Sequence, residues 1–165
     1  NNTWCQDNPL GWMHWQPDAG DLALRTYLQR LLQLRRQLLP LLNPELPFEE
    51  QPQRRSTDPS HRWRQWHGVE IDRPDWAAWS HTLAWTINDS REGPLLWCGL
   101  NAYGKAIHFD LPVSPAGWLR VIDTALQAGE DLPSQPQRWT PLGIPLESRS
   151  LVLLVSRPLL ANATL

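Results

Sequence analysis

Residues 150–156 read Ser-Leu-Val-Leu-Leu-Val-Ser, and this stretch decides the fold class of the chain. The five residues 151–155 are all apolar, so a strand built from them presents apolar side chains on both of its faces. Such a strand belongs in the interior of a sheet, where both faces are covered. We therefore predict a central β-strand here.

Short runs that are apolar or alternate between apolar and polar residues precede this segment, at residues 80–88, 94–100, 105–111 and 118–123. Turn-forming residues separate them, and no helical pattern intervenes. Several short strands at this spacing are typical of an antiparallel sandwich or barrel. We predict a mainly β fold, with an antiparallel β-sandwich over residues 61–165.

A helical pattern occupies residues 22–39. Apolar side chains recur there at steps of mostly three and four residues, which predicts an amphipathic helix with a stripe of Leu24, Tyr27, Leu28, Leu31, Leu34 and Leu38. We expect Asp18 or Asp21 to cap the helix and Pro40 to help end it. Because a large apolar stripe is seldom left uncovered, the helix should pack on the sandwich or on another copy of the chain.

The remaining segments set the domain boundaries. Residues 1–20 are rich in Asn, Asp, Gly, Pro and Trp and are expected to form a loop. Residues 43–60 contain four prolines among mixed charges, which is typical of a partly extended linker. The chain therefore divides into residues 1–42, a linker at 43–60, and the β-domain at 61–165.

Composition excludes several classes of protein. The 165 residues carry a net charge of −2, without the basic stripe that nucleic-acid binding requires. No apolar run approaches the ~18 residues of a membrane span. Cys5 and Cys98 offer no disulfide framework, which favours a reducing compartment such as the cytoplasm. The chain begins at Asn1 with its single Met at position 13, so we expect the C-terminal piece of a longer protein.

Motifs for catalysis and cofactor binding are weak. The five His and two Cys lack zinc-ligand spacing, with His67 near Glu70 as one weak pair, and no nucleophile elbow or phosphate-binding glycine loop occurs. Ser80-His81 has no orienting acid nearby in the sequence. Most carboxylates lie in turn-like contexts where Asp caps or bonds the backbone, so we expect structural roles for all of them except Asp7. We predict no catalytic residue, metal or cofactor in this chain.

Eleven tryptophans are the strongest compositional signal, and six of them form pairs three residues apart: Trp12/Trp15, Trp63/Trp66 and Trp76/Trp79. Flat indole faces can stack on sugar rings. Each ring can equally fill a core or interface, which is the more common use of a single Trp. Among eleven, we expect at least one ring to face a sugar.

The chain opens with Asn-Asn-Thr-Trp-Cys-Gln-Asp-Asn, followed by Trp-Met-His-Trp at 12–15. This stretch is similar to the motif N-N-x-Y-C-Q-D-N…W-x-D-W, and through it the chain resembles the isoamylase-type glycogen debranching enzymes of the α-amylase superfamily. Pro9-Leu10-Gly11 and His14 depart from the family pattern in this loop. Collinear similarities follow at residues 31–35, 66–68, 74–76, 80–84, 101–103, 109–112, 118–124 and 149–153.

This resemblance implies a parent glycoside hydrolase that cleaves α-1,6 branch linkages in glycogen or starch-like glucan. Residues 1–42 would carry an active-site loop and the last helix of a (β/α)₈ barrel, followed by the C-terminal sandwich. The catalytic carboxylates would lie upstream of Asn1, so the chain alone would be inactive. Its glucan contacts would come from the loop residues Trp4, Asp7, Asn8 and Trp12.

Two other hypotheses remain open. The chain could be a stand-alone, Trp-rich glucan-binding module, in which exposed indole faces hold the polysaccharide without any barrel. It could instead be purely structural, with its tryptophans filling the core and the interdomain contact. The structural hypothesis predicts low exposure for Trp63, Trp66, Trp76 and Trp79.

Overall fold

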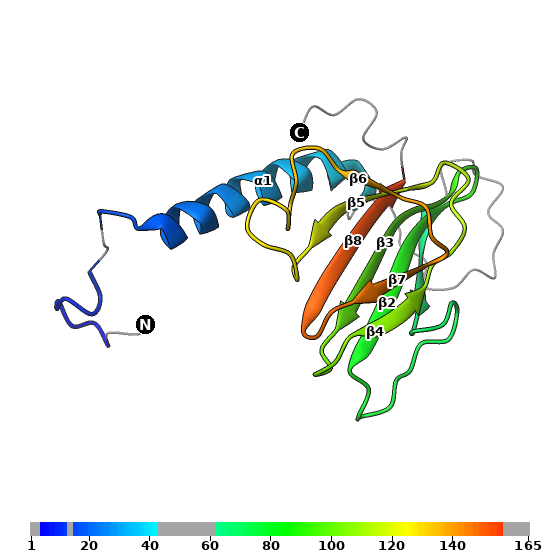
Figure 1. Ribbon diagram of the computed structural model, residues 1–165, viewed down its shortest axis with the longest axis horizontal. Coiled ribbons are helices and arrows are strands. Elements are labelled where there is room, and N and C mark those ends of the chain that lie inside the picture. Colours follow the sequence, from blue (N-terminus) through cyan, green and yellow to red (C-terminus); the bar gives the residue numbers. More distant parts are fainter. Residues whose placement is uncertain (1–3, 13–14, 43–61, 157–165) are drawn as a thin grey trace.

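The computed structural model describes residues 4–12, 15–42 and 62–156, and these residues form one helix and eight strands (Figure 1). The fold is mainly β, as predicted. The elements are α1 (Ala19–Leu42), β1 (Arg62–His67), β2 (Thr82–Asp89), β3 (Gly93–Asn101), β4 (Ile107–Asp110), β5 (Trp118–Asp123), β6 (Gln137–Trp139), β7 (Gly143–Leu146) and β8 (Ser150–Ser156).

Six strands form one antiparallel sheet in the order β1-β2-β3-β8-β5-β6, and β4 pairs with β7 in a second, two-stranded sheet. Strand β8 lies between β3 and β5, with Trp97 of β3 opposite Leu154. The predicted central strand is therefore confirmed. Its side chains alternate between two apolar clusters, one on each face of the sheet.

Two clusters of buried side chains make the molecule three-layered. One lies between the large sheet and the small sheet and contains Trp97, Phe109, Trp118, Ile144, Leu146, Val152 and Leu154. The other lies between the opposite face of the large sheet and α1, and contains Leu34, Leu38, Leu41, Ile87, Leu96, Cys98, Val121 and Val155. The two sheets thus pack as the expected sandwich, and the helix covers the outer face of the larger one.

Helix α1 begins with a reciprocal cap. The backbone N–H of Asp21 donates to the Asp18 carboxylate (2.8 Å), and the backbone N–H of Asp18 donates to the Asp21 carboxylate (3.2 Å). Two otherwise unpaired N–H groups are satisfied in this way, as in a capping box. The predicted cap at Asp18 is therefore confirmed, and the helix begins at Ala19, three residues before the predicted pattern.

The predicted end of the helix is wrong, because α1 continues two residues past Pro40. A proline removes one backbone hydrogen bond and crowds the preceding turn. Continuing the helix places Leu41 three residues after Leu38 on the same face, and both side chains are buried against the sheet. That burial offsets the lost hydrogen bond.

Only part of the apolar stripe is covered. Leu34 and Leu38 are buried and Leu31 packs against them, whereas Leu24 and Leu28 near the start of the helix are about half exposed. In Figure 1 the N-terminal half of α1 extends beyond the sheets. The prediction that the helix packs on the sandwich is therefore correct for its C-terminal half.

Strands β1, β6 and β7 were not predicted. Strand β1 is an edge strand that carries two arginines, β6 has three residues, and β7 contains Pro145. Edge strands tolerate charge and proline because one of their sides is unpaired, so their sequences lack a clear apolar period. The predicted linker at 43–60 lies outside the described residues. Within the described residues, α1 lacks the sustained apolar character that crossing a membrane requires.

Candidate functional site

The N-terminal loop, residues 4–12, is a turn closed by its own polar groups. The indole N–H of Trp12 donates to the Asp7 carboxylate. The Asn8 side-chain oxygen accepts from the backbone N–H of Leu10 (3.0 Å), and the Asn8 carbonyl accepts from the N–H of Gly11 (2.9 Å). The fold therefore brings Asp7, Asn8 and Trp12 together on one small turn.

Trp4, the fourth predicted glucan contact, enters the same loop in a strained conformation. Trp4 and Cys5 both have positive φ angles, of 51° and 61°. Left-handed backbone costs a non-glycine residue roughly 1–2 kcal/mol. The Trp4 ring is 82% exposed and that of Trp12 is 58% exposed, so both present large aromatic surfaces to solvent.

A second polar cluster lies at the end of β1, where the sequence reads Trp-His-Gly at 66–68. The His67 side chain is buried, and its Nε2 lies 3.0 Å from the Thr86 hydroxyl oxygen. Its Nδ1 accepts a hydrogen bond from the backbone N–H of Asp72 (2.9 Å), which fixes the proton of the neutral ring on Nε2. The sequence had offered His67 only as a weak metal-site candidate.

Burial lowers the pKa of His67, and the nearby Asp72 carboxylate offsets part of this effect. The ring is therefore neutral at pH 7. The Asp72 carboxylate accepts a hydrogen bond from the Gln65 amide (2.6 Å). The backbone of Asp72 is in the left-handed region, with a φ of 60°. The histidine thus acts as a buried connector that holds the turn after β1.

A third polar centre is Asn101 at the end of β3. Its buried amide nitrogen lies 2.9–3.0 Å from the carbonyl oxygens of Lys105, Leu146 and Glu147, and its oxygen accepts from the backbone N–H of Tyr103 (2.9 Å). The side chain thus joins the turn after β3 to the end of β7. Its role is to join the two sheets.

The carboxylates of the β-domain that lie near basic groups have structural partners. Asp123 is bound by Arg120 at 3.0 Å, and Glu70 is bound by Arg73 at 2.6 Å. No cluster of three or more His, Cys, Asp or Glu side chains that could hold a metal ion occurs within residues 4–12, 15–42 and 62–156.

The tryptophans divide into two groups. Trp97 and Trp118 are buried and Trp63 and Trp66 are half-buried, whereas Trp76 and Trp79 are 64% and 79% exposed. The purely structural hypothesis predicted low exposure for the four paired residues in the β-domain, and Trp76 and Trp79 contradict it. Both lie in the connection between β1 and β2, outside the strands whose alternating side chains face the core.

Comparison with known proteins gives a consistent family. Residues 65–139 match the family described as "Isoamylase 1-3, C-terminal". The glycogen debranching enzyme of Pectobacterium atrosepticum is 36% identical over 83 residues, which are 50% of this chain and 11% of that protein. That of Erwinia tasmaniensis is 32% identical over 139 residues, which are 84% of this chain and 18% of that protein. The chloroplastic isoamylase 1 of Oryza sativa subsp. japonica is 24% identical over 132 residues, 79% of this chain and 15% of that protein.

The chain therefore aligns with less than a fifth of the length of these relatives. The family match begins within β1 and ends at the last residue of β6, so it covers most of the large sheet together with β4. This chain accordingly belongs to the isoamylase-type glycogen debranching enzymes and represents a C-terminal region of that family.

Proposed function

We propose that the chain is the C-terminal part of a cytoplasmic enzyme of the α-amylase superfamily that hydrolyses α-1,6-glucosidic branch linkages of glycogen or a starch-like glucan. The observation that carries this proposal is the match of residues 65–139 to an isoamylase C-terminal family. The names of the bacterial relatives point to glycogen as the substrate class. The reaction would follow the retaining mechanism with two carboxyl groups, one acting as the nucleophile and one as the acid and base.

The N-terminal loop would supply glucan contacts to the active site. The Asp7 carboxylate is exposed and receives one hydrogen bond from Trp12 at Oδ1, which leaves Oδ2 for a sugar hydroxyl. Asn8 holds the turn, and the exposed rings of Trp4 and Trp12 offer flat faces to glucose units. These four residues fit a surface that contacts substrate without carrying out the bond cleavage.

The catalytic carboxylates would come from an upstream (β/α)₈ barrel. In the β-domain, Asp72, Asp123 and Glu70 are engaged by neighbouring side chains, which suits structural roles. Residues 1–42 would form the end of the barrel, and the exposed leucines near the start of α1 would pack against it. The sandwich, joined through the linker at 43–60, would support the barrel.

Two experiments test this function. Incubated alone with glycogen, the chain should release no linear chains. A chimaera in which it replaces the aligned region of the Erwinia tasmaniensis enzyme should debranch glycogen, whereas that enzyme truncated before the region should not. Release of linear chains by this chain alone, or an inactive, folded chimaera, would contradict the proposal.

A stand-alone glucan-binding module is the alternative, and the exposure of Trp76 and Trp79 favours it. Such a module would bind glycogen tightly by itself, and the chimaera would not debranch. The two functions are therefore separated by the activity of the chimaera.

A further inference from the structure

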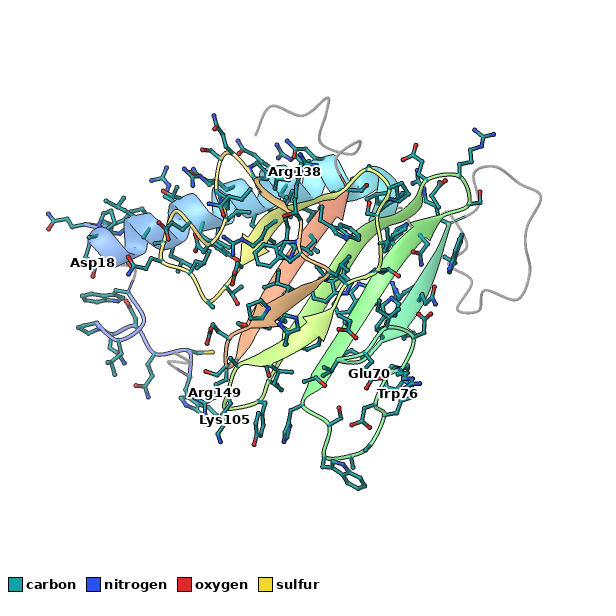
Figure 2. The ribbon with its side chains drawn as sticks, turned by 45° about the vertical axis from the view of Figure 1, so that its right-hand side comes forward. Asp18, Glu70, Trp76, Lys105, Arg138 and Arg149 are labelled. Atoms are coloured by element: carbon teal, nitrogen blue, oxygen red, sulfur yellow. The ribbon has the colours of Figure 1, made fainter. Side chains whose placement is uncertain are left out.

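The connection between β1 and β2 presents two tryptophan side chains to solvent. Trp76 and Trp79 are three residues apart, and most of each side chain is exposed. Figure 2 shows Trp76 well separated from Asp18 at the start of α1, and Figure 1 places the same connection far from the N-terminal loop. The connection that carries these rings is therefore separate from the loop that carries Asp7.

The connection is held in one shape at both of its ends. At its start, Gly68 packs so closely that a Cβ atom there would lie 2.2 Å from the carbonyl oxygen of Arg73. Next to the exposed rings, the Asp75 carboxylate accepts from the backbone N–H of Ala77 (3.0 Å), and the N–H of Ser80 bonds the Ala77 carbonyl (2.9 Å). A surface fixed before binding loses little conformational entropy when a ligand arrives.

Trp76 packs against the indole of Trp66, which in turn packs against a second indole. Its ring lies 5.6 Å from that of Trp66 in an edge-to-face arrangement, and Trp66 makes a similar contact with Trp85 at 6.0 Å. The guanidinium of Arg64 lies 5.4 Å from the Trp66 ring. Edge-to-face pairs restrict the orientation of both rings. Trp76 is therefore oriented although most of it is exposed.

The connection that carries the two rings also carries polar groups. These are the Glu70–Arg73 ion pair, with its atoms 2.6 Å apart, and the Asp75 carboxylate. An aromatic face carries partial negative charge and attracts the weakly positive C–H groups on the flat side of a pyranose. Ion pairs and carboxylates beside it can bond sugar hydroxyls. This combination suits a neutral polyhydroxylated chain better than an apolar protein surface.

We propose that Trp76 and Trp79 form a platform for successive glucose units of an α-glucan chain, distinct from the N-terminal loop. The choice of an α-glucan rests on the proposed function, since exposed rings beside polar groups favour a sugar and the family supplies its linkage. The platform would hold the polymer at the connection between β1 and β2.

Affinity electrophoresis of the 165-residue chain in native gels with and without glycogen tests the platform. Glycogen should retard the wild type, and free maltoheptaose should relieve the retardation. Trp76→Ala and Trp79→Ala should each weaken binding about 2- to 12-fold, the loss expected for one aromatic contact, and the double variant should lose most of it. Trp76→Phe, which keeps a flat ring, should retain more binding than Trp76→Ala.

A control variant and a comparison variant make the result specific. Leu142→Ala removes another large exposed apolar side chain and should leave retardation unchanged. Trp12→Ala removes a proposed glucan contact of the N-terminal loop, so it measures the share of the retardation that comes from that loop. Circular dichroism should show that all variants keep the β-fold.

Some outcomes would overturn the platform. Absence of retardation in the wild type would do so, as would equal retardation of the wild type and the Trp76/Trp79 double variant. Loss of retardation only in Trp12→Ala would assign binding to the N-terminal loop. A double variant that still binds glycogen but loses self-association in light scattering would assign the rings to contact between copies. The chimaera's debranching activity does not depend on these outcomes, so failure of the platform and failure of the proposed function remain distinguishable.

Discussion

The imidazole Nε2 of His67 on β1 lies 3.0 Å from the Thr86 hydroxyl oxygen on β2, and both side chains are buried in the described structure. Thr86 Oγ1 also accepts a hydrogen bond from the Asn88 amide (2.9 Å). The edge of the large sheet is therefore tied to its neighbour by a side-chain network, in addition to the backbone ladder.

This network predicts a stability that depends on pH. The pKa of His67 is lowered in the folded state by burial, so the unfolded chain takes up this proton first as pH falls. The contribution of the neutral His67 ring to the free energy of unfolding is complete above the pKa of about 6.5 that histidine has in the unfolded chain. It is lost as the pH falls from there towards the lower pKa of His67 in the folded state. Urea unfolding between pH 8 and 5 should show stability falling with a slope of at most about 1.4 kcal/mol per pH unit from this group.

The control is His67→Gln, whose amide can keep both hydrogen bonds without titrating. The difference in stability between wild type and variant should shrink or reverse as pH falls below about 6.5. A difference that stays constant from pH 8 to 5 would show that the ring titrates alike in both states. All other side chains are the same in the two proteins, so the difference isolates the contribution of the imidazole.

Gly68 is predicted to be intolerant of any side chain. A Cβ atom would meet the Arg73 carbonyl at 2.2 Å, and a backbone atom cannot move aside as a flexible side chain can. Gly68→Ala should lower the free energy of unfolding by about 1–3 kcal/mol, the range for overpacking. Gly104→Ala is the matched control, because nothing lies within 4 Å of its Cβ position. Equal urea midpoints for the two variants would contradict the close approach.

Asn101 should tolerate neither alanine nor aspartate, and aspartate should be worse at pH 7. Alanine removes the donor to three carbonyl groups and the acceptor for Tyr103, at a cost of about 2–3 kcal/mol. Aspartate keeps the acceptor but places negative charge beside those carbonyl oxygens. Thermal melts at pH 7 should rank wild type above Asn101→Ala and Asn101→Ala above Asn101→Asp. The reverse order of the two variants would mean that the amide nitrogen is not the group that matters.

Sequence reasoning succeeded where local composition alone sets the outcome. The run at 151–155 is apolar on both faces, and such a strand has few stable positions other than the centre of a sheet. Sequence reasoning failed where contacts with residues distant in the sequence determine where an element ends. The helix passes Pro40 because Leu41 is buried against the sheet, and nothing in the local sequence reports that burial.

The candidate site was predictable only in part. The five-residue separation of Asp7 and Trp12 does not predict the hydrogen bond between them. The motif around them did single out this loop as a candidate glucan contact. Trp63/Trp66 and Trp76/Trp79 share the same spacing, yet one pair lies on a strand and the other in a connection, so their exposures differ. A three-residue spacing carries no information on burial outside a helix.

The two cysteines should differ sharply in reactivity. Burial raises the pKa of Cys98 to about 12, so almost no thiolate forms at pH 8, whereas Cys5 is exposed. Ellman's reagent at pH 8 should therefore modify about one thiol per folded chain and about two after denaturation. Cys5→Ser should remove the reaction of the folded chain. Rapid modification of Cys98 in folded Cys5→Ser would contradict its burial.

The leucines of α1 should differ in their contribution to stability according to their position along the helix. Leu38 is 4% exposed and packs on the large sheet, so Leu38→Ala should cost about 2–5 kcal/mol, the range for a cavity in a packed core. Leu28, ten residues earlier, is 48% exposed, and Leu28→Ala should change the free energy of unfolding of this chain by less than about 1 kcal/mol. In the active chimaera, where the proposed barrel covers the start of α1, Leu28→Ala should become clearly destabilising. Because the substitution is identical in both proteins, an equally small effect in the chimaera would place the barrel elsewhere and leave the N-terminal half of the helix without its proposed partner.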